Sequence, residues 1–464
     1  MGYLGRVPDR HVSTETSQPS PAEDEPLSAW NPGSGQAAEA ASVPMKRLQL
    51  ADHRLGVVAC LGLQPLRALR RLRHWFAPPP PEASAKRVLL IKFWGIGSLQ
   101  LLVPAVRALR ARHPDARIEL LTLRQNDEFA RGLDAFDAVR TFDVQGASWL
   151  RIGMRILGLV RSLRRERFDR VVDFEFFTRF SAVIALLSGA PQSTGFAAPS
   201  IWRGGFHTKT AQFNRYWHVS RNFRNLAGGE NGVPVAPGDL VPFRVKPQHR
   251  AALETQLGPL AESDGRPLVV LNPNAGSLSL ERRWPPERFA GLALALANRT
   301  PLRLVLVGAP SERDWTSSVA ARLVGLDRSQ FLNLAGHLDI GSLNALLERA
   351  DLFVGNDSGP MHLAAAHGTP TLGLFGPETP VMYAPLGTRA EGLYRPPACS
   401  PCINVHNNKV ASCVRGHPEC LTNLEISEVF ERAQALLDSR PLRLVPQPIL
   451  RPGPKEVGEA GARA

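Results

Sequence analysis

The sequence predicts an α/β protein of two similar halves, each a parallel sheet whose strands alternate with helices. Short apolar runs bounded by turns, such as Arg87–Phe93 and Leu352–Val354, are typical of buried parallel strands. Stretches with apolar residues at helical spacing separate these runs. A Gly- and Pro-rich stretch at 232–238, with the polar stretch that follows it to Gly265, divides the chain as a linker would. Together these observations predict two Rossmann-like domains that face a cleft.

Composition narrows the classes of partner. The chain has 464 residues, of which 44% are hydrophobic and 21% charged, as in globular proteins. The apolar runs are shorter than the ~18 residues of a membrane helix. A net charge of +13 favours an anionic partner, such as a membrane surface or a phosphorylated substrate. Nucleic acid ranks last, because no zinc finger or RNA-binding aromatic motif is present. The start of the chain does not resemble a secretory signal, so we expect a cytoplasmic protein.

Two terminal regions differ from the rest. Residues 1–85 are predicted to be a disordered tail, over about the first fifty residues, followed by a basic amphipathic segment. Between Leu61 and Phe76, leucines and aromatic residues alternate with arginines, which predicts a helix that can lie on anionic lipid. The alternative is a helix that packs on the body of the protein with a solvated basic face. Residues 439–464 form a Pro-rich tail.

The first predicted domain spans 86–240. Its first strand leads through the turn Gly95–Ser98 into a helix over Leu99–Arg112, which Pro104 should kink. Further strands are expected at Ile118–Thr122, Val139–Asp143 and Arg170–Phe174, and further helices at Trp149–Arg165 and Phe180–Leu187.

The second predicted domain spans 265–438 and repeats this plan. Strands are expected at Leu268–Leu271, Arg303–Val307, Leu352–Val354 and Thr371–Phe375. Helices are expected at Glu287–Ala297, Glu312–Leu323, Ser342–Arg349, Met361–His367 and Glu425–Leu437.

The stretch after Leu352–Val354 predicts an anion site. The strand breaks at Gly355 and Asn356, Asp357 or Ser358 can cap a helix, and Pro360 suits its first turn. Backbone N–H groups and the helix dipole then point at one spot beyond the strand, where phosphates commonly bind. Asp357 can hold a ribose hydroxyl, and His362 lies on the first turns of the helix. The alternative is an ordinary capped helix with a histidine in the core.

The same stretch resembles the signature of a known family. The run from Asp357 to Ala366, followed by Gly-Thr-Pro-Thr at 368–371 and Leu-Phe-Gly-Pro at 374–377, is similar to glycosyltransferase family 9, the lipopolysaccharide heptosyltransferase family. The likeness extends over roughly Lys86 to Leu437. It implies the GT-B arrangement and an inverting glycosyltransferase, with a nucleotide-diphosphate sugar such as ADP-heptose as donor. It implies a lipopolysaccharide or other glycolipid acceptor. The basic amphipathic segment and the net charge predict a peripheral place on the inner face of the cytoplasmic membrane.

The resemblance assigns donor-binding residues to the second half. Ser277 follows the turn after Leu268–Leu271, and Arg282 stands two residues before Trp284-Pro285; by this match both hold the diphosphate. An arginine can grip a pyrophosphate with a bidentate fork. Glu312 is expected near the ribose or base. Asp357, Ser358, Gly359 and His362 complete the predicted donor site. An exposed loop with incidental arginines, and a carboxylate that merely starts a helix, are the alternatives.

The first half departs from the family pattern. Family 9 proteins generally have Gly-Asp after the first strand, and that aspartate is thought to be the catalytic base; here the residue is Ser98. A serine hydroxyl is not a base near neutral pH without a partner. Either the base has moved, or the chain is an inactive relative, or the acceptor group is more acidic. Asp173 and Glu175, at the end of another strand, are the candidate replacements; the alternative is that both are salt-bridged carboxylates.

Four cysteines cluster near the end of the second half, at Cys399, Cys402, Cys413 and Cys420. Four thiolates with one Cys-x-x-Cys pair can form a tetrahedral structural zinc site. Free thiols are the alternative, and a cytosolic location disfavours disulfides. No other cofactor is expected, because backbone donors and an arginine can stabilise a departing diphosphate without a metal.

Two rival functions remain at this stage. One is a non-catalytic, membrane-associated protein that binds a nucleotide sugar after losing the base. Donor binding without turnover would identify it. The other is an NAD-dependent enzyme, which is disfavoured because no Gly-x-Gly-x-x-Gly run follows a strand with an acidic residue about 20 positions later.

Overall fold

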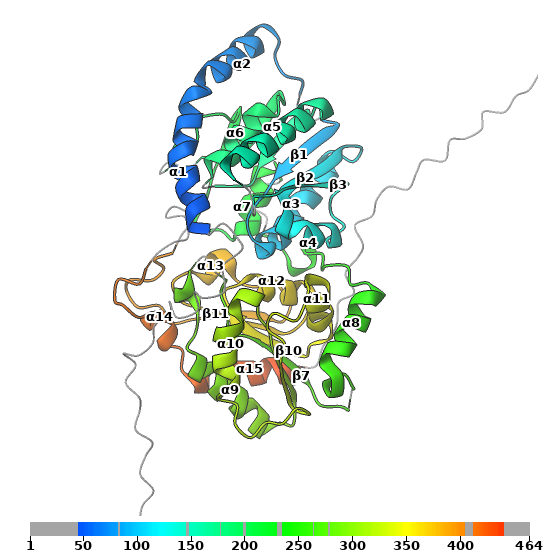
Figure 1. Cartoon of the computed structure of the whole chain (residues 1–464), viewed down its shortest axis with the longest axis vertical. Helices are drawn as coiled ribbons and strands as arrows, with labels where there is room; N and C mark the ends of the chain where they lie inside the picture. Colours follow the sequence, from blue (N-terminus) through cyan, green and yellow to red (C-terminus); the bar gives the residue numbers. More distant parts are fainter. Residues whose placement is uncertain are drawn as a thin grey trace, which may run out of the picture. The chain divides into compact units, whose positions relative to one another are not determined.

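Two parallel sheets, each of six strands, form the framework of the chain in the computed structural model (Figure 1). The structure describes residues 45–81, 84–144, 148–176, 178–197, 201–229, 234–262, 264–276, 279–403 and 412–439. Within these ranges, no helix is both long and apolar enough to span a bilayer. The predicted Pro-rich tail beyond Ser439 and most of the predicted N-terminal tail lie outside them.

The sheet of the first half has the strand order β3-β2-β1-β4-β5-β6, with every neighbouring pair parallel. The strand order runs outward in opposite directions from β1 and β4. Doubly wound folds bind ligands at this topological switch point. The strands are β1 (Arg87–Ile91), β2 (Arg117–Leu123), β3 (Ala138–Phe142), β4 (Arg170–Asp173), β5 (Gln192–Ala197) and β6 (Lys209–Gln212). The helices are α3 (Ile96–Arg112), α4 (Asp127–Gly132), α5 (Trp149–Glu166), α6 (Arg179–Leu187) and α7 (Val219–Leu226).

The sheet of the second half has the order β12-β11-β10-β7-β8-β9, which is the same winding read from the other edge. Its switch point lies between β7 and β10. The strands are β7 (Leu268–Asn272), β8 (Arg303–Leu306), β9 (Phe331–Asn333), β10 (Leu352–Asn356), β11 (Thr371–Phe375) and β12 (Ala390–Tyr394). The helices are α8 (Pro247–Leu257), α9 (Pro286–Arg299), α10 (Arg313–Ala320), α11 (Ile340–Arg349), α12 (Gly359–Ala366), α13 (Pro380–Tyr383), α14 (Glu419–Thr422) and α15 (Ile426–Asp438).

The continuous apolar runs are explained by burial on both faces of each sheet. Along β1, Val88 and Leu90 pack with α3 and α7, whereas Leu89 and Ile91 pack with α5 and α6. Successive strand residues point to opposite faces, so a strand covered on both sides must be apolar throughout. The prediction of two Rossmann-like sheets is confirmed.

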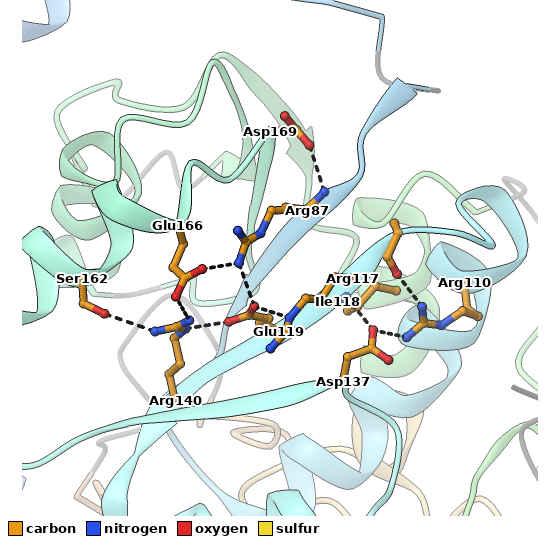
Figure 2. Close-up of polar contacts among 11 residues, drawn as sticks. Arg87, Arg110, Arg117, Ile118, Glu119, Asp137, Arg140, Ser162, Glu166 and Asp169 are labelled. Carbon is orange, nitrogen blue, oxygen red and sulfur yellow. Dashed lines mark hydrogen bonds and ion pairs between the residues drawn. The ribbon is translucent and has the colours of Figure 1, made fainter. Parts of the chain in front are cut away.

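An ion-pair network ties α5 to the first three strands (Figure 2). The fully buried carboxylate of Glu119 accepts hydrogen bonds from Arg117 Nε at 2.7 Å and from Arg140 Nε at 2.6 Å. Arg140 also donates to Glu166, the last residue of α5, at 2.7 Å, and Arg87 bonds the same carboxylate. Because Arg87 and Arg140 each pair with both Glu119 and Glu166, the network fixes the end of α5 on the sheet.

The N-terminal helices differ from expectation. The helix α1 (Met45–Gly62) begins inside the range predicted to be a disordered tail, and α2 (Gln64–Phe76) follows it. Asp52 accepts hydrogen bonds from the first two amides of α6, those of Arg179 at 2.9 Å and Phe180 at 2.8 Å. Cys60 packs against α6 residues that include Ala182. A carboxylate on free helix amides is an N-cap, here supplied from far along the chain.

The stretch predicted to link the halves holds a helix. Within it, α8 packs on α11, where Arg250 and Glu348 pair at 2.8 Å and the His249 ring lies against Gly341. The second half therefore begins before the predicted boundary at residue 265. The elements β5, β6 and α7 lacked a strong pattern, because Gln192–Ala197 and Lys209–Gln212 are mostly polar or small.

Candidate active site

The signature stretch forms the predicted strand, turn and helix. The strand β10 runs two residues further than expected, to Asn356, and α12 begins at Gly359 after an extended Ser358. Pro360 lies in the first turn, and Gly368 ends the helix with a φ of +76°, a conformation that glycine adopts without strain. The first turn of α12 therefore sits at the carboxyl end of β10, beside the switch point.

Buried asparagines hold the loops at this switch point. Asn272, the last residue of β7, donates to the Ser358 hydroxyl at 3.2 Å. Asn356 accepts from the Trp284 amide at 3.0 Å and donates to the Asn274 carbonyl at 3.3 Å. These bonds join the ends of β7 and β10 to the loop that carries Arg282.

Arg282 and Asp357, both predicted donor residues, are in direct contact. Arg282 Nη1 donates to the Asp357 carbonyl at 2.8 Å and lies 3.2 Å from Asp357 Oδ2, while Nη2 bonds the Ala275 carbonyl. Both side chains are largely buried. The guanidinium therefore joins the loop after β7 to the turn after β10.

Glu312 supports the same loop from the other side. Its Oε1 accepts from the Gly276 amide at 3.0 Å, and its Oε2 accepts from the Ala309 amide at 2.8 Å. Gly276 has a φ of +69°, which favours glycine. Glu312 thus positions the turn to which Ser277 belongs; Ser277 itself lies outside the described residues.

Gly359 and His362 face the first half of the chain. A Cβ on Gly97 would come within 2.9 Å of His362 Cδ2 and 3.0 Å of Gly359 Cα, and one on Gly359 within 2.8 Å of Ile96 Cγ1. The start of α3 therefore lies against the start of α12, as expected for a turn Gly95–Ser98 that faces the second half. Ser98 is in the first turn of α3 and partly exposed.

Glu175 sits at the switch point of the first half. Its Oε1 accepts from Lys92 Nζ at 2.8 Å, from the Phe93 amide at 2.6 Å and from the Trp94 amide at 3.2 Å. Both Lys92 and Glu175 are almost fully buried. Glu175 thereby holds the turn that leads into Gly95–Ser98. Lys92 was not singled out from the sequence, although a charged residue directly after an apolar strand can mark a site at the end of that strand.

Charged side chains from both halves influence the buried phenol of Tyr383. Burial raises the pKa of Tyr383 well above its usual value, and the carboxylates of Glu378, Asp357 and Glu175 contribute to the rise. Tyr383 and Glu378 were not singled out from the sequence, although Glu378 directly follows the Leu-Phe-Gly-Pro run. The two switch points therefore share an electrostatic environment.

Asp173 belongs to a separate network although it is two residues from Glu175. Its Oδ2 accepts from Ser181 at 2.9 Å, lies 3.1 Å from His207 Nε2 and pairs with Arg203, and its Oδ1 accepts from the Glu175 amide at 3.0 Å. Burial alone would raise the pKa of Asp173, but Arg203 and His207 outweigh it and lower the pKa. Asp173 and Glu175 therefore have different partners.

The four clustered cysteines are free thiols. Burial first, and then the neighbouring Cys402, Cys413 and Cys399, raise the pKa of Cys420 to about 12, so its thiol is neutral at physiological pH. In the part of the chain that is described, no three His, Cys, Asp or Glu side chains are grouped to hold a metal ion. Structural zinc stays a prediction without a preformed site, and metal analysis of the purified protein would test it.

Comparison with known proteins decides the family. The model of glycosyltransferase family 9 (heptosyltransferase) matches residues 156–411, more than half of the chain. The chain belongs to glycosyltransferase family 9. It is therefore a glycosyltransferase, as the signature predicted.

Similar proteins span most of the chain. Lipopolysaccharide heptosyltransferase 2 of Salmonella typhimurium is 26% identical over 362 residues, which cover 76% of this chain and 98% of that protein. Lipopolysaccharide heptosyltransferase 3 of Escherichia coli is 26% identical over 298 residues, or 62% of this chain and 82% of that protein. The solved E. coli ADP-heptose lps heptosyltransferase II aligns with a TM-score of 0.59 at 23% identity, covering 76% and 98% of the two chains. The likeness confirms the GT-B fold.

Proposed function

We propose that this family 9 enzyme transfers a heptose from ADP-heptose to a lipopolysaccharide core acceptor, with inversion at the anomeric carbon. The names of its similar proteins support this donor and acceptor. The observation that carries the proposal is the contact of Arg282 with Asp357 at the switch point, directly beside the start of α12. The rival reading, a binding protein without activity, rests on Ser98 in place of the aspartate that the family generally has.

The second half would hold the donor. Amides at the start of α12 supply donors for a diphosphate, and Arg282 adds a guanidinium already positioned by Asp357 and Ala275. Such fixed donors stabilise the charge that grows on the departing ADP in the transition state. Asp357, beside the guanidinium, would accept a hydrogen bond from a ribose or sugar hydroxyl.

We assign the base to Glu175 in preference to Asp173. In the reaction, an acceptor hydroxyl attacks the anomeric carbon, the bond to the diphosphate breaks, and the hydroxyl proton passes to a carboxylate. Both oxygens of Asp173 are engaged, Oδ2 by Arg203, His207 and Ser181 and Oδ1 by the Glu175 amide. The three bonds to Glu175, in contrast, all fall on Oε1. The Glu175 carboxylate accepts from the Trp94 amide, just before the turn Gly95–Ser98. Its negative charge also contributes to the raised pKa of Tyr383 in the second half. Lys92 Nζ donates to the Glu175 carboxylate at 2.8 Å.

The basic helix α2 would attach the enzyme reversibly to the cytoplasmic face of an anionic membrane, where a lipid-linked acceptor lies. Its Leu69, Leu72 and Trp75 are exposed among arginines. Attachment of this kind weakens as salt rises, because screened charges attract less. Flotation with anionic vesicles at low and high salt measures it, and binding indifferent to salt would contradict it.

The test of the main proposal is a transfer assay with ADP-heptose and a lipopolysaccharide acceptor that lacks the added heptose. We expect a product heavier by one heptose, with the anomeric configuration inverted relative to the donor. Binding of ADP-heptose without any product, on acceptors truncated at different core positions, would instead establish the binding-only reading.

A further inference from the structure

Helix α5 exposes a row of large apolar side chains. Leu150, Met154 and Leu157 are 75%, 58% and 48% exposed, and their spacing of four and three residues puts them on one side of the helix. Trp149 at the start of α5 is also exposed. The opposite side of α5 packs on the sheet through Val160 and Leu163. The apolar row is therefore additional to the residues that dock the helix.

A second row runs along α1 and α2. Leu55, Val58 and Leu61 on α1 are exposed at intervals of three residues, and Leu69, Leu72, Trp75 and Phe76 continue the spacing on α2. The two helices are nearly continuous, since the amide of Leu63 bonds the Ala59 carbonyl and that of Arg67 bonds the Leu63 carbonyl. On the other side of the pair, α1 packs on α6, and α2 bonds the carbonyls of Gly204 and Phe206 through Gln64 and Arg70.

Both rows lie on the same side of the first sheet. Helices α5 and α6 cover one face of that sheet, and α1 packs on α6 (Figure 1). Arg164 of α5 donates to the Leu187 carbonyl at the end of α6 at 2.9 Å. The side of α5 that carries Arg164 therefore faces α6. Leu157 and Leu150 stand seven and fourteen residues before Arg164, which places them near that side.

The outer sides of these helices are basic. Exposed arginines include Arg71 and Arg73 on α2 and Arg151, Arg161 and Arg165 on α5. The described residues of the three helices include two acids, and both turn inward: Asp52 caps α6, and Glu166 pairs with Arg140 and Arg87. Apolar side chains surrounded by arginines complement a bilayer with anionic headgroups, because basic residues near the surface are attracted to those headgroups.

We propose that the exposed rows of α5 and of α1–α2 form one surface that binds to an anionic lipid bilayer. The proposal rests on the proposed function in one respect, since a lipid-linked acceptor gives the enzyme a reason to lie on a membrane. Two separate rows hold the first half in a defined orientation, which a single amphipathic helix cannot do. The turn Gly95–Ser98 then keeps a fixed orientation relative to the membrane.

The test compares the full chain with the variant Leu150→Gln/Met154→Gln/Leu157→Gln in vesicle flotation. Vesicles contain phosphatidylethanolamine with or without phosphatidylglycerol. The variant should partition onto anionic vesicles at least tenfold more weakly, because three apolar side chains no longer enter the interface. A matched control, Val324→Gln/Val414→Gln, removes exposed valines of the second half and should bind as the unmodified chain does.

A second measurement needs no variant. Amide hydrogen exchange over residues 149–158 of the full chain should slow when anionic vesicles are added, together with that over 69–76. Slowing over 69–76 alone, or flotation of the triple variant equal to that of the unmodified chain, would overturn the proposal. A dimer in light scattering that the triple variant converts to monomer would overturn it too, because a second copy would then cover the row.

Failure here is distinguishable from failure of the proposed function. Flotation and exchange involve no sugar and proceed whether or not transfer is found. Transfer from ADP-heptose to a water-soluble, delipidated acceptor reports the function by itself, and the triple variant should retain that activity. Loss of activity on the soluble acceptor would indicate that the α5 row serves the reaction site, which contradicts the proposal.

Discussion

Two charged pairs occupy corresponding places in the two halves. Lys92 and Glu175 join the ends of β1 and β4, and Arg282, from the loop after β7, pairs with Asp357 at the end of β10. Each pair sits at the topological switch point of its sheet, where carboxyl ends of neighbouring strands diverge and leave room for a ligand. At the scale of single residues, these pairs are where binding and chemistry can be separated by substitution.

Arg282→Gln should weaken ADP binding by about 10- to 100-fold. The reason is the loss of a charge-assisted hydrogen bond to the diphosphate, which contributes about 1.5–3 kcal/mol. The ADP affinity of Arg282→Lys should lie between those of the unmodified chain and Arg282→Gln, because lysine keeps the charge but lacks the bidentate guanidinium fork. Titration calorimetry with ADP measures the affinity. Unchanged affinity in Arg282→Gln would show that the arginine serves only to hold the loop.

Glu175→Gln should lower kcat per folded molecule by about 10²–10⁴-fold with nearly constant donor affinity, since the amide keeps the shape and loses the basicity. It should also destabilise the fold, because the buried Lys92 loses its counter-charge. Ser98→Ala should cost far less, about 1 kcal/mol for one hydrogen bond. Steady-state transfer kinetics distinguish the two. If Ser98→Ala is inactive while Glu175→Gln works at the unmodified rate, the base is not Glu175.

Asp173→Asn should destabilise the fold by about 3–5 kcal/mol, because it leaves the buried Arg203 without its counter-charge. This substitution is therefore a poor kinetic control for Glu175→Gln, despite the closeness of the two residues in sequence. Urea unfolding measures the loss. A midpoint equal to that of the unmodified chain would mean that water or another group compensates Arg203.

At the scale of elements, α1 is joined to the first half by Asp52 at the start of α6. Asp52→Ala should destabilise the protein by about 0.5–2 kcal/mol, the usual contribution of an N-cap. Asp52→Asn should keep most of the stability, since an amide oxygen also accepts from helix amides. Thermal unfolding of the two variants makes the comparison, and equal losses in both would point to the charge instead of the cap.

At the scale of the whole molecule, a buried histidine joins α7 to the segment after α13. His218 Nε2 lies 3.0 Å from the Ala384 carbonyl, and its Nδ1 accepts from the Ser220 amide at 3.3 Å, which suits the neutral ring. Burial lowers the pKa of His218 to about 4, and burial does the same for His367. Both rings are therefore neutral in the folded protein near pH 7.

Stability should fall as the pH drops from about 6.5 to about 4. In this window the unfolded chain binds a proton at each histidine while the folded protein does not, so protonation favours unfolding. The contribution of His218 is on the order of 3 kcal/mol. Urea unfolding at pH 7 and pH 4.5 tests it, and His218→Gln should show a smaller drop. An identical drop in that variant would assign the effect to other groups.

The sequence by itself determined the strand and helix pattern and the loops of the donor site. Buried strands such as the one at Leu352–Val354 are continuous apolar runs, and the turn at Asp357 and Ser358 carries its own Gly and Pro signals, so local chemistry specifies them. Arg282 and Asp357 were both predicted, because each belongs to a contiguous motif.

Only the tertiary structure decided which charges meet. Glu175 pairs with Lys92 from a strand 83 residues earlier, and Asp173 pairs instead with Arg203 and His207. The capping of α6 by Asp52 and the packing of α8 on α11 likewise join distant segments. Local periodicity shows which face of an element is apolar, whereas the partner of a buried charge depends on which elements the fold brings together. The exposed row of α5 became visible for the same reason, since burial is a property of the packed molecule.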